Sequence, residues 1–393
     1  MIHVDADSFL VIVLVSAIAA LIVGIGGSRV IIPVVVLELS LGIVVGPDVL
    51  GLADSDEFIN FFASLGLGML FFFAGYEIDF ERIKGAPLKL AAIGWLISLA
   101  LAYAIGGLLA AAGIVLSLLF TGSALATTAI GTLIPILSDA GELKTRFGTY
   151  LLAAGAVGEF GPILLITLFF SADNPLTSGL LLIAFVLIAV LAAVFAIRGV
   201  SSNWSAIERT LETSSQLPVR MAVVLVFLLA ALATDLGLDL LLGGFVAGII
   251  TRLALSGHEV QIFESKLKAV GYGFLIPFFF VVSGVEFKLD ALVSDPGELF
   301  KVPVFLVAFL VVRGVPAMLL YVRELELRDR VALAFFSSTE LPLVVAITTI
   351  AINNGQMRGT TAASLVGAAV LSTAIYPLIG LRLRGSREVP EGA

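Results

Sequence analysis

The sequence Gly155-Ala-Val-Gly-Glu-Phe-Gly-Pro162 lies inside a hydrophobic run from about Gly148 to Phe170. Glu159 puts a carboxylate near the middle of that run. An acidic residue at the centre of a membrane-spanning helix costs roughly 2.5–3.5 kcal/mol of insertion free energy. The residues around it weaken a helix further: Gly158, Gly161 and Pro162. We therefore expect a helix break and a binding site here, with the rest of the chain built to hold and move that site.

The composition is that of a polytopic membrane protein. Of 393 residues, 60% are hydrophobic and 13% are charged, whereas soluble domains have about 25% charged residues. The absence of cysteine excludes disulfides and thiol chemistry. The two histidines, His3 and His258, lie outside the apolar runs. This argues against a histidine-based metal centre, and we expect no cofactor.

Thirteen apolar runs are long enough to span a bilayer, which requires about 20 residues each. The run from Leu88 to Ile136 is divided at Ala112–Ser117 because it is too long for one span. We predict an all-α protein of thirteen transmembrane helices, with centres near Ala17, Glu38, Gly68, Leu101, Ala129, Glu159, Ala189, Leu228, Ala247, Phe279, Val311, Val344 and Val370.

The orientation follows from the basic residues, which favour cytoplasmic loops. With the N-terminus outside, most of the 22 Lys and Arg residues fall in inside loops, and the outside loops at 48–57 and 290–298 are acidic. The first residues are also acidic, so we expect no cleavable signal peptide. We predict a multi-pass protein of the inner (cell) membrane with a cytoplasmic C-terminus.

The chain repeats itself. Phe71–Asp79 resembles Phe279–Asp290, and Ala126–Ala129 resembles Ser337–Glu340. Two six-helix units separated by one span, at about Gly179 to Arg198, would have opposite topology. Inverted repeats indicate secondary transporters, whose sites lie between the repeats near the membrane midplane.

Four ionisable residues lie near the centres of spans: Glu38, Glu159, Arg313 and Glu340. Ala369 is the repeat counterpart of Glu159, and Tyr103 is that of Arg313. Since neither charge is repeated, both favour a functional role over a purely structural one. Glu159 is predicted to bind a cation and a proton in competition, with structural pairing to Arg313 as the alternative. Arg313 is either a counter-charge for the empty site or part of a permanent salt bridge.

The two remaining acids have more structural interpretations. Glu340 precedes Pro342, where a helix must break and free backbone groups, so support of that break is favoured over direct ion ligation. Glu38 precedes Gly42 and Gly46, a spacing typical of close helix packing, and a structural role is favoured.

Hydroxyl groups beside a second helix break are candidate ion ligands. Thr127 and Thr128 precede Gly131 and Pro135. Threonine hydroxyls and freed carbonyls suit Na⁺ or K⁺, although a threonine in a membrane helix commonly bonds its own backbone. The matching Ser-Thr-Glu-Leu-Pro sequence that ends at Pro342 predicts a pair of broken helices.

Five segments resemble motifs of the monovalent cation:proton antiporters, the branch with bacterial Na⁺/H⁺ and K⁺/H⁺ exchangers. The similarity covers nearly the whole chain: Pro33–Pro47, Leu70–Asp79, Leu242–Gly248, Pro277–Gly284 and Ser338–Glu340.

The resemblance implies a homodimer in which a mobile core domain slides past a scaffold domain. It also implies that runs five and twelve are broken and cross. The domains would divide as scaffold helices 1–3 (1–87), core helices 4–6 (88–171), connecting helix 7 with a cytoplasmic loop (172–217), scaffold helices 8–10 (218–298), core helices 11–13 (299–383) and a cytoplasmic tail (384–393).

The chain departs from the family where two adjacent polar residues are usual. Here the pair is Gly158-Glu159, so the binding carboxylate carries over to Glu159 and its neighbour is lost. The basic residue of the eleventh run carries over to Arg313. One carboxylate beside an arginine that keeps its proton predicts electroneutral one-for-one exchange. We expect no nucleotide-binding gating domain after residue 383.

The resulting hypothesis is a cation/proton antiporter, not an enzyme, whose partners are Na⁺ or K⁺, H⁺ and the bilayer, without nucleic acid. Glu159 would be the ion ligand, assisted by Thr127 and Thr128. The alternatives are an organic anion symporter on a related fold, which a basic site would favour, and a transport-inactive sensor or channel-like homologue.

Overall fold

The computed structural model describes residues 5–26, 33–78, 80–169, 177, 179–191, 194, 210, 213–236, 238, 240–254, 260–293 and 296–385. This part of the chain is helical and contains no strand, as its composition predicts. Much of the predicted connecting segment 172–217, the tail residues 386–393, His3 and His258 lie outside the described residues.

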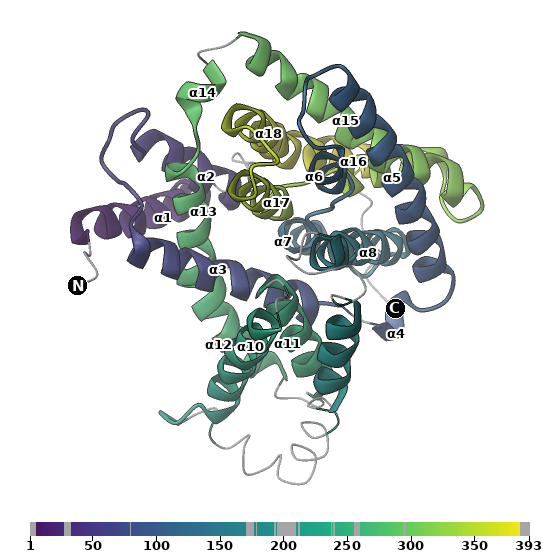
Figure 1. Ribbon diagram of the computed structural model, residues 1–393. Helices are drawn as coiled ribbons and strands as arrows, with labels where there is room; N and C mark the ends of the chain where they lie inside the picture. Colours follow the sequence, from purple (N-terminus) through teal and green to yellow (C-terminus); the bar gives the residue numbers. More distant parts are fainter. Residues whose placement is uncertain are drawn as a thin grey trace. The chain divides into compact units, whose positions relative to one another are not determined.

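Figure 1 shows the described helices, coloured in their order along the chain. Their bounds are α1 Ala6–Gly26, α2 Val34–Val45, α3 Glu57–Tyr76, α4 Phe80–Ile83, α5 Ala86–Ala111, α6 Leu118–Leu125, α7 Ile130–Asp139, α8 Arg146–Phe169, α10 Leu217–Asp235, α11 Leu240–Ala254, α12 Val260–Val270, the π-helix η2 Gly271–Leu275, α13 Ile276–Val285, α14 Leu289–Val293, α15 Pro296–Leu320, the 3₁₀ turn η3 Tyr321–Arg323, α16 Leu327–Ser337, α17 Pro342–Asn353 and α18 Gly359–Arg384.

Nine helical segments within the described residues are long and apolar enough to cross a membrane. Shorter apolar helices of 10–17 residues cover Val34–Val45, Leu118–Ile134, Gly179–Leu191 and Leu241–Ala254. The chain is therefore a multi-pass membrane protein, as predicted.

The chain forms two compact units. Unit 1 comprises Met1–Ser16, Ser55–Ile78 and Ile163–Val282, and unit 2 comprises Ala17–Asp54, Asp79–Pro162 and Ser283–Ala393. The predicted site residues all belong to unit 2. The six-part division into scaffold and core stays a prediction.

Unit 1 is held by close backbone approach between α3 and α11. A Cβ on Gly75 would lie 2.0 Å from the carbonyl O of Phe245, and one on Gly248 would lie 2.0 Å from the carbonyl O of Phe72. No side chain fits at either position, so these glycines allow the two helices to pack backbone against backbone.

Unit 2 uses the same device between α2 and the end of α13. A Cβ on Gly284 would lie 2.2 Å from the carbonyl O of Leu39 and 2.8 Å from Gly42 Cα. The close packing predicted from the Gly42–Gly46 spacing is confirmed. Elsewhere in unit 2, α7, α8 and α16 share a buried apolar cluster that includes Leu137, Leu151 and Leu333.

The helix breaks are not all where the sequence predicted them. α8 runs without interruption through Gly158, Gly161 and Pro162, so the break expected there is wrong. Pro135 lies inside α7, and the break predicted near it lies between α6 and α7, before Ile130. A proline removes one backbone N–H from a helix, but neighbouring segments can satisfy the freed carbonyl and the helix then continues. Pro342 does begin α17, as predicted.

Candidate functional site

Two helix breaks meet in unit 2. One separates α6 from α7 at Ala126–Ala129, and the other separates α16 from α17 at Ser338–Leu341. The backbone N–H of Ala129 donates to the carbonyl O of Thr339 at 2.8 Å. The Thr128 hydroxyl donates to the carbonyl O of Ser337 at 2.5 Å. Each break therefore satisfies backbone groups that the other one exposes, as membrane burial requires.

Glu340 is fixed within the second break. Its side chain is 0% exposed, and Oε2 accepts a hydrogen bond from the Thr127 hydroxyl at 3.1 Å. On α18, Ser372 accepts from the Glu340 N–H at 3.0 Å and donates to its carbonyl O at 3.1 Å. Within the described residues, Oε1 has no hydrogen-bond partner.

Glu159 lies on α8 beside the first break and is 2% exposed. Pro162 has no N–H, so it cannot bond the carbonyl O of Gly158, four residues earlier. The backbone N–H of Thr128 donates to that oxygen at 3.1 Å. Pro162 therefore does not break α8. It leaves the carbonyl O of Gly158, the residue before Glu159, available to bond the first break.

Arg313 of α15 ties four elements together through neutral oxygens. Nε donates to the Thr128 hydroxyl at 2.9 Å and to the Ser337 carbonyl O at 3.4 Å. Nη1 donates to the Ser98 hydroxyl at 3.2 Å, and Nη2 donates to the Ala154 carbonyl O at 3.0 Å. None of the ion pairs found in the described residues includes Arg313. Within the described residues, no ion pair supports the salt-bridge interpretation of Arg313.

Gly158 lies next to the guanidinium of Arg313. A Cβ on Gly158 would lie 2.4 Å from Arg313 Nη2 and 2.8 Å from Thr128 Oγ1. Arg313 thus occupies the space that a side chain at position 158 would use. This gives a steric reason for glycine at a position where the resemblance to the antiporters implies a polar residue.

The charged side chains Arg313 and Glu340 lie near helix ends of opposite partial charge. A helix carries partial negative charge at its C-terminus and partial positive charge at its N-terminus. The guanidinium of Arg313, which extends from α15, lies at the C-terminus of α16 and bonds the Ser337 carbonyl O. Glu340 precedes the N-terminus of α17, which begins at Pro342. The two charges therefore complement the two helix ends.

Two side chains of α5 that were not among the predicted site residues also contact the site. Trp95 donates from Nε1 to the carbonyl O of Ala126 at 3.1 Å, and Ser98 accepts from Arg313. A Cβ on Gly161 would lie 2.4 Å from Trp95 Cε2, so this glycine admits the indole. Both residues carry polar groups in an apolar run, which was the available signal.

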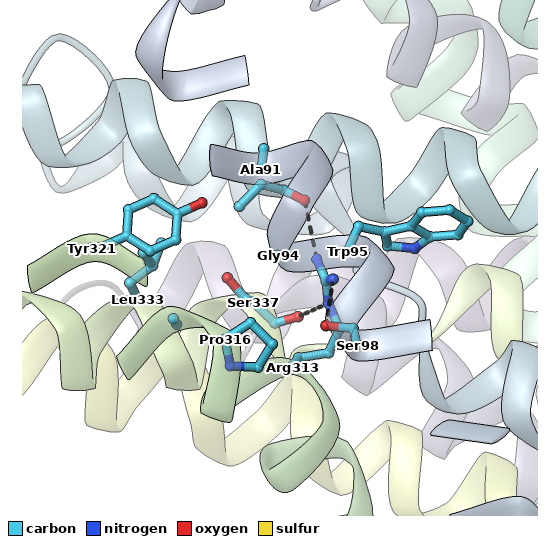
Figure 2. A pocket seen from close by; sticks show the side chains of 11 residues that line it. Ala91, Gly94, Trp95, Ser98, Arg313, Pro316, Tyr321, Leu333 and Ser337 are labelled. Atoms are coloured by element: carbon cyan, nitrogen blue, oxygen red, sulfur yellow. Dashed lines mark hydrogen bonds between the residues drawn. The ribbon is translucent and has the colours of Figure 1, made fainter. Parts of the chain in front are cut away.

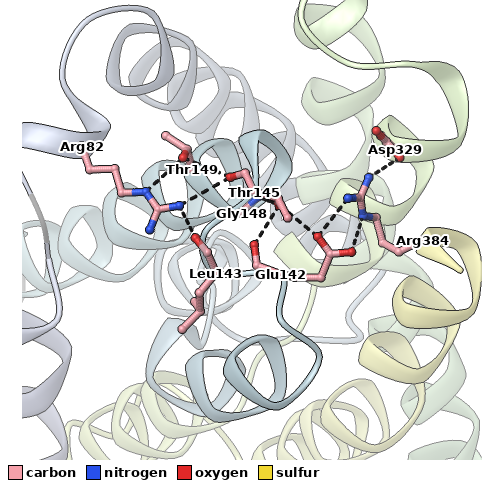
Figure 3. Close-up of polar contacts among 8 residues, drawn as sticks. All are labelled: Arg82, Glu142, Leu143, Thr145, Gly148, Thr149, Asp329 and Arg384. Atoms are coloured by element: carbon pink, nitrogen blue, oxygen red, sulfur yellow. Dashed lines mark hydrogen bonds and ion pairs between the residues drawn. The ribbon is translucent and has the colours of Figure 1, made fainter. Parts of the chain in front are cut away.

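A buried ion-pair network fixes the N-terminal end of α8 (Figure 3). Arg384 of α18 bonds both carboxylate oxygens of Glu142 at 2.9 Å and lies 2.6 Å from Asp329 of α16. Thr145 donates to Glu142 and accepts from the N–H of Gly148 at 3.0 Å, which caps α8. Arg82 bonds the carbonyl O of Leu143 in the same loop.

The described residues contain no group of three or more His, Cys, Asp and Glu side chains that could hold a metal ion. A cation at the two breaks would be bound by carboxylate, hydroxyl and carbonyl oxygens. Such a donor set suits a weakly bound monovalent ion that must leave again.

Comparison with known families places these features in context. The family described as "sodium/hydrogen exchanger, transmembrane" matches residues 13–380. The putative Na⁺/H⁺ antiporter YjbQ of Bacillus subtilis is 27% identical over 410 residues, covering 100% of this chain and 65% of that protein. The probable Na⁺/H⁺ antiporter 3 of Methanocaldococcus jannaschii is 30% identical over 265 residues, covering 65% of this chain and 66% of that protein. The chain thus spans about two thirds of the length of these relatives.

A solved structure shares the fold. The sodium proton antiporter MjNhaP1 from Methanocaldococcus jannaschii superposes with a TM-score of 0.66, covering 96% of this chain and 99% of that one. The sequence identity is 17%, so this likeness concerns the fold alone.

Proposed function

The chain belongs to the sodium/hydrogen exchanger family, and from that premise we propose that it exchanges Na⁺ or K⁺ for H⁺ across the membrane. The observation that carries the proposal is the position of Glu159. It is a buried carboxylate one residue from Gly158, whose carbonyl O bonds the first helix break.

Glu159 is the proposed exchange ligand. Burial makes the ionised form of a carboxylate costly, so binding of a proton or of a cation is favoured at Glu159. Proton and cation therefore compete for it, and a site that takes either one and faces the two sides in turn performs antiport. Thr127, Thr128 and backbone carbonyls of the break supply the neutral ligands.

Arg313 is the proposed counter-charge, and Glu340 is the proposed support of the second break. Four hydrogen bonds to neutral oxygens hold the guanidinium close to the first break. A guanidinium held in this way keeps its positive charge throughout the transport cycle. This supports one-for-one electroneutral exchange, in which only Glu159 changes between its proton and its cation.

We further propose an elevator-type movement of a core domain, a homodimer, and thirteen spans in inverted repeats with the N-terminus outside. The paired breaks of α6–α7 and α16–α17 support the repeat, because matching segments of the two halves contact each other. Each predicted run centre falls within one of the long or short apolar helices, which supports the count.

Reconstitution in liposomes with a trapped pH-sensitive dye tests the exchange. Adding Na⁺ or K⁺ outside should dissipate a preset pH gradient, and Glu159→Gln should abolish the signal. Glu38→Gln is the matched control, because Glu38 is another buried glutamate and has no hydrogen bond to either break in the described residues. Loss of activity in both variants, or in neither, would remove Glu159 from its assigned role.

The same liposomes test the stoichiometry. With the membrane potential clamped by an ionophore, one-for-one exchange should proceed at a rate that does not depend on the potential. A rate that rises with an inside-negative potential would show net charge movement and contradict electroneutrality.

A further inference from the structure

A small pocket in unit 2 lies beside Arg313 and outside the two helix breaks (Figure 2). α5 contributes Trp95 and Ser98 to its wall, and α15 contributes Arg313. Tyr321 and Ser337 complete its polar lining. Figure 2 shows the guanidinium of Arg313 between Ser98 and Ser337.

The polar groups of this pocket are mainly unused donors. A guanidinium has five N–H groups, and the bonds to Thr128, Ser98 and Ala154 account for three of them. Ser98 Oγ accepts from Arg313, and its own hydrogen has no acceptor in the described residues. Ser337 is buried, and its Oγ has no hydrogen-bond partner in that part of the chain.

Glu340 attracts the charge of Arg313 at longer range, but Arg313 has no ion-pair partner within the described residues. No carboxylate of the described residues forms an ion pair with Arg313 within 4.0 Å. A buried charge without a partner is expensive. Surplus donors around a fixed positive charge favour an acceptor that carries negative charge.

We propose that this pocket binds a small inorganic anion of the halide class as the counter-ion of Arg313. The pocket is small, which favours a single-atom or few-atom anion. Ser98 and Ser337 donate to it, and Arg313 supplies the charge. The inference does not depend on the proposed cation exchange, because anion binding needs no gradient and no transport.

The test is equilibrium binding of radiolabelled chloride to the purified full chain in lipid nanodiscs. The Na⁺ concentration is held constant with sodium gluconate. Saturable binding that bromide displaces and gluconate does not is the expected result. Ser98→Ala and Ser337→Ala should each weaken binding about tenfold, the effect of losing one hydrogen bond to a charged group.

Two further variants keep the result interpretable. Arg313→Gln should abolish binding, and its thermal unfolding profile shows whether it still folds. Ser364→Ala is the matched control, because this buried serine of α18 bonds Glu298 and does not line the pocket. Absence of saturable chloride binding by the wild type would overturn the proposal and indicate that water fills the pocket. Unchanged binding in the Ser98→Ala/Ser337→Ala double variant would overturn it as well.

Discussion

Gly158 of α8 and Arg313 of α15 form a matched pair, since a Cβ at position 158 would lie 2.4 Å from Arg313 Nη2. The guanidinium in turn bonds Thr128 of the first break and Ser337 at the second. The absence of a side chain at position 158 therefore leaves space for the Arg313 guanidinium to bond residues at both breaks.

Gly158→Ala should displace this guanidinium. Overpacking of this kind costs about 1–3 kcal/mol, and the displaced charge should also slow exchange. Thermal unfolding and liposome exchange measure the two effects. Gly107→Ala on α5 is the control, because a Cβ there meets nothing within 4 Å. An unchanged Gly158→Ala protein would contradict the pairing.

Thr127→Val and Thr128→Val should differ, because their hydroxyls have different partners. Thr127 is a proposed cation ligand and bonds the Glu340 carboxylate, so its loss should raise the KM for the cation. Thr128 bonds Arg313 and Ser337, so its loss should destabilise the protein by about 1–3 kcal/mol. Thr348→Val is the matched control, because Thr348 is buried and bonds only its own helix. Equal effects of all three variants would indicate general packing.

Pro162→Ala should stabilise α8 and slow exchange. The new N–H can bond the carbonyl O of Gly158, which now accepts from Thr128. Helix propensity favours alanine over proline by about 3 kcal/mol, while the link between α8 and the break weakens. A higher unfolding temperature with unchanged exchange would show that this link is dispensable.

Arg384→Ala should be severely destabilising. Its guanidinium is buried between Glu142 and Asp329 and lies 4.4 Å from the ring centroid of Phe147. Removal of one member of a buried ion pair costs about 3–5 kcal/mol. Arg146→Ala is the comparison, because Arg146 is exposed in its pair with Glu324 and should change stability little. Unfolding in mixed micelles measures both, and comparable effects would contradict a special role of the buried network.

Stability should fall as pH rises from about 4.5 to 7 because of Glu77, which follows α3 in unit 1. Burial raises the pKa of Glu77 from 4.5 to about 7, against the opposing effect of the Lys268 ammonium, whose Nζ lies 3.9 Å from Oε1. The folded state then holds a proton that the unfolded state releases. The contribution of Glu77 to the free energy of unfolding is greatest below pH 4.5, and up to about 3 kcal/mol of it is lost above pH 7.

Unfolding free energies at pH 5 and pH 8 test this dependence. Glu77→Gln should flatten it, and Glu286→Gln should leave it in place, because Glu286 is the exposed counterpart of Glu77 in the second half of the chain. A wild-type protein that is equally stable at both pH values would rule out the proposed titration.

The sequence by itself determined the membrane class, the positions of the apolar segments and the family resemblance. These depend on local composition and on motifs, which need no tertiary contact to be recognised. It also located Glu159 and Glu340 as acids at membrane depth, because the cost of a charge in an apolar run is visible in the run itself.

The tertiary structure alone decided how these residues are arranged. Pro162 was expected to break α8, but Thr128, a residue of the first break, satisfies the carbonyl that the proline frees. The partners of Arg313 are four oxygens from α5, α8, the first break and the C-terminal end of α16, and no local pattern predicts that combination. Whether a proline breaks a helix, and whether a glycine is required, depends on what packs against it from elsewhere in the chain.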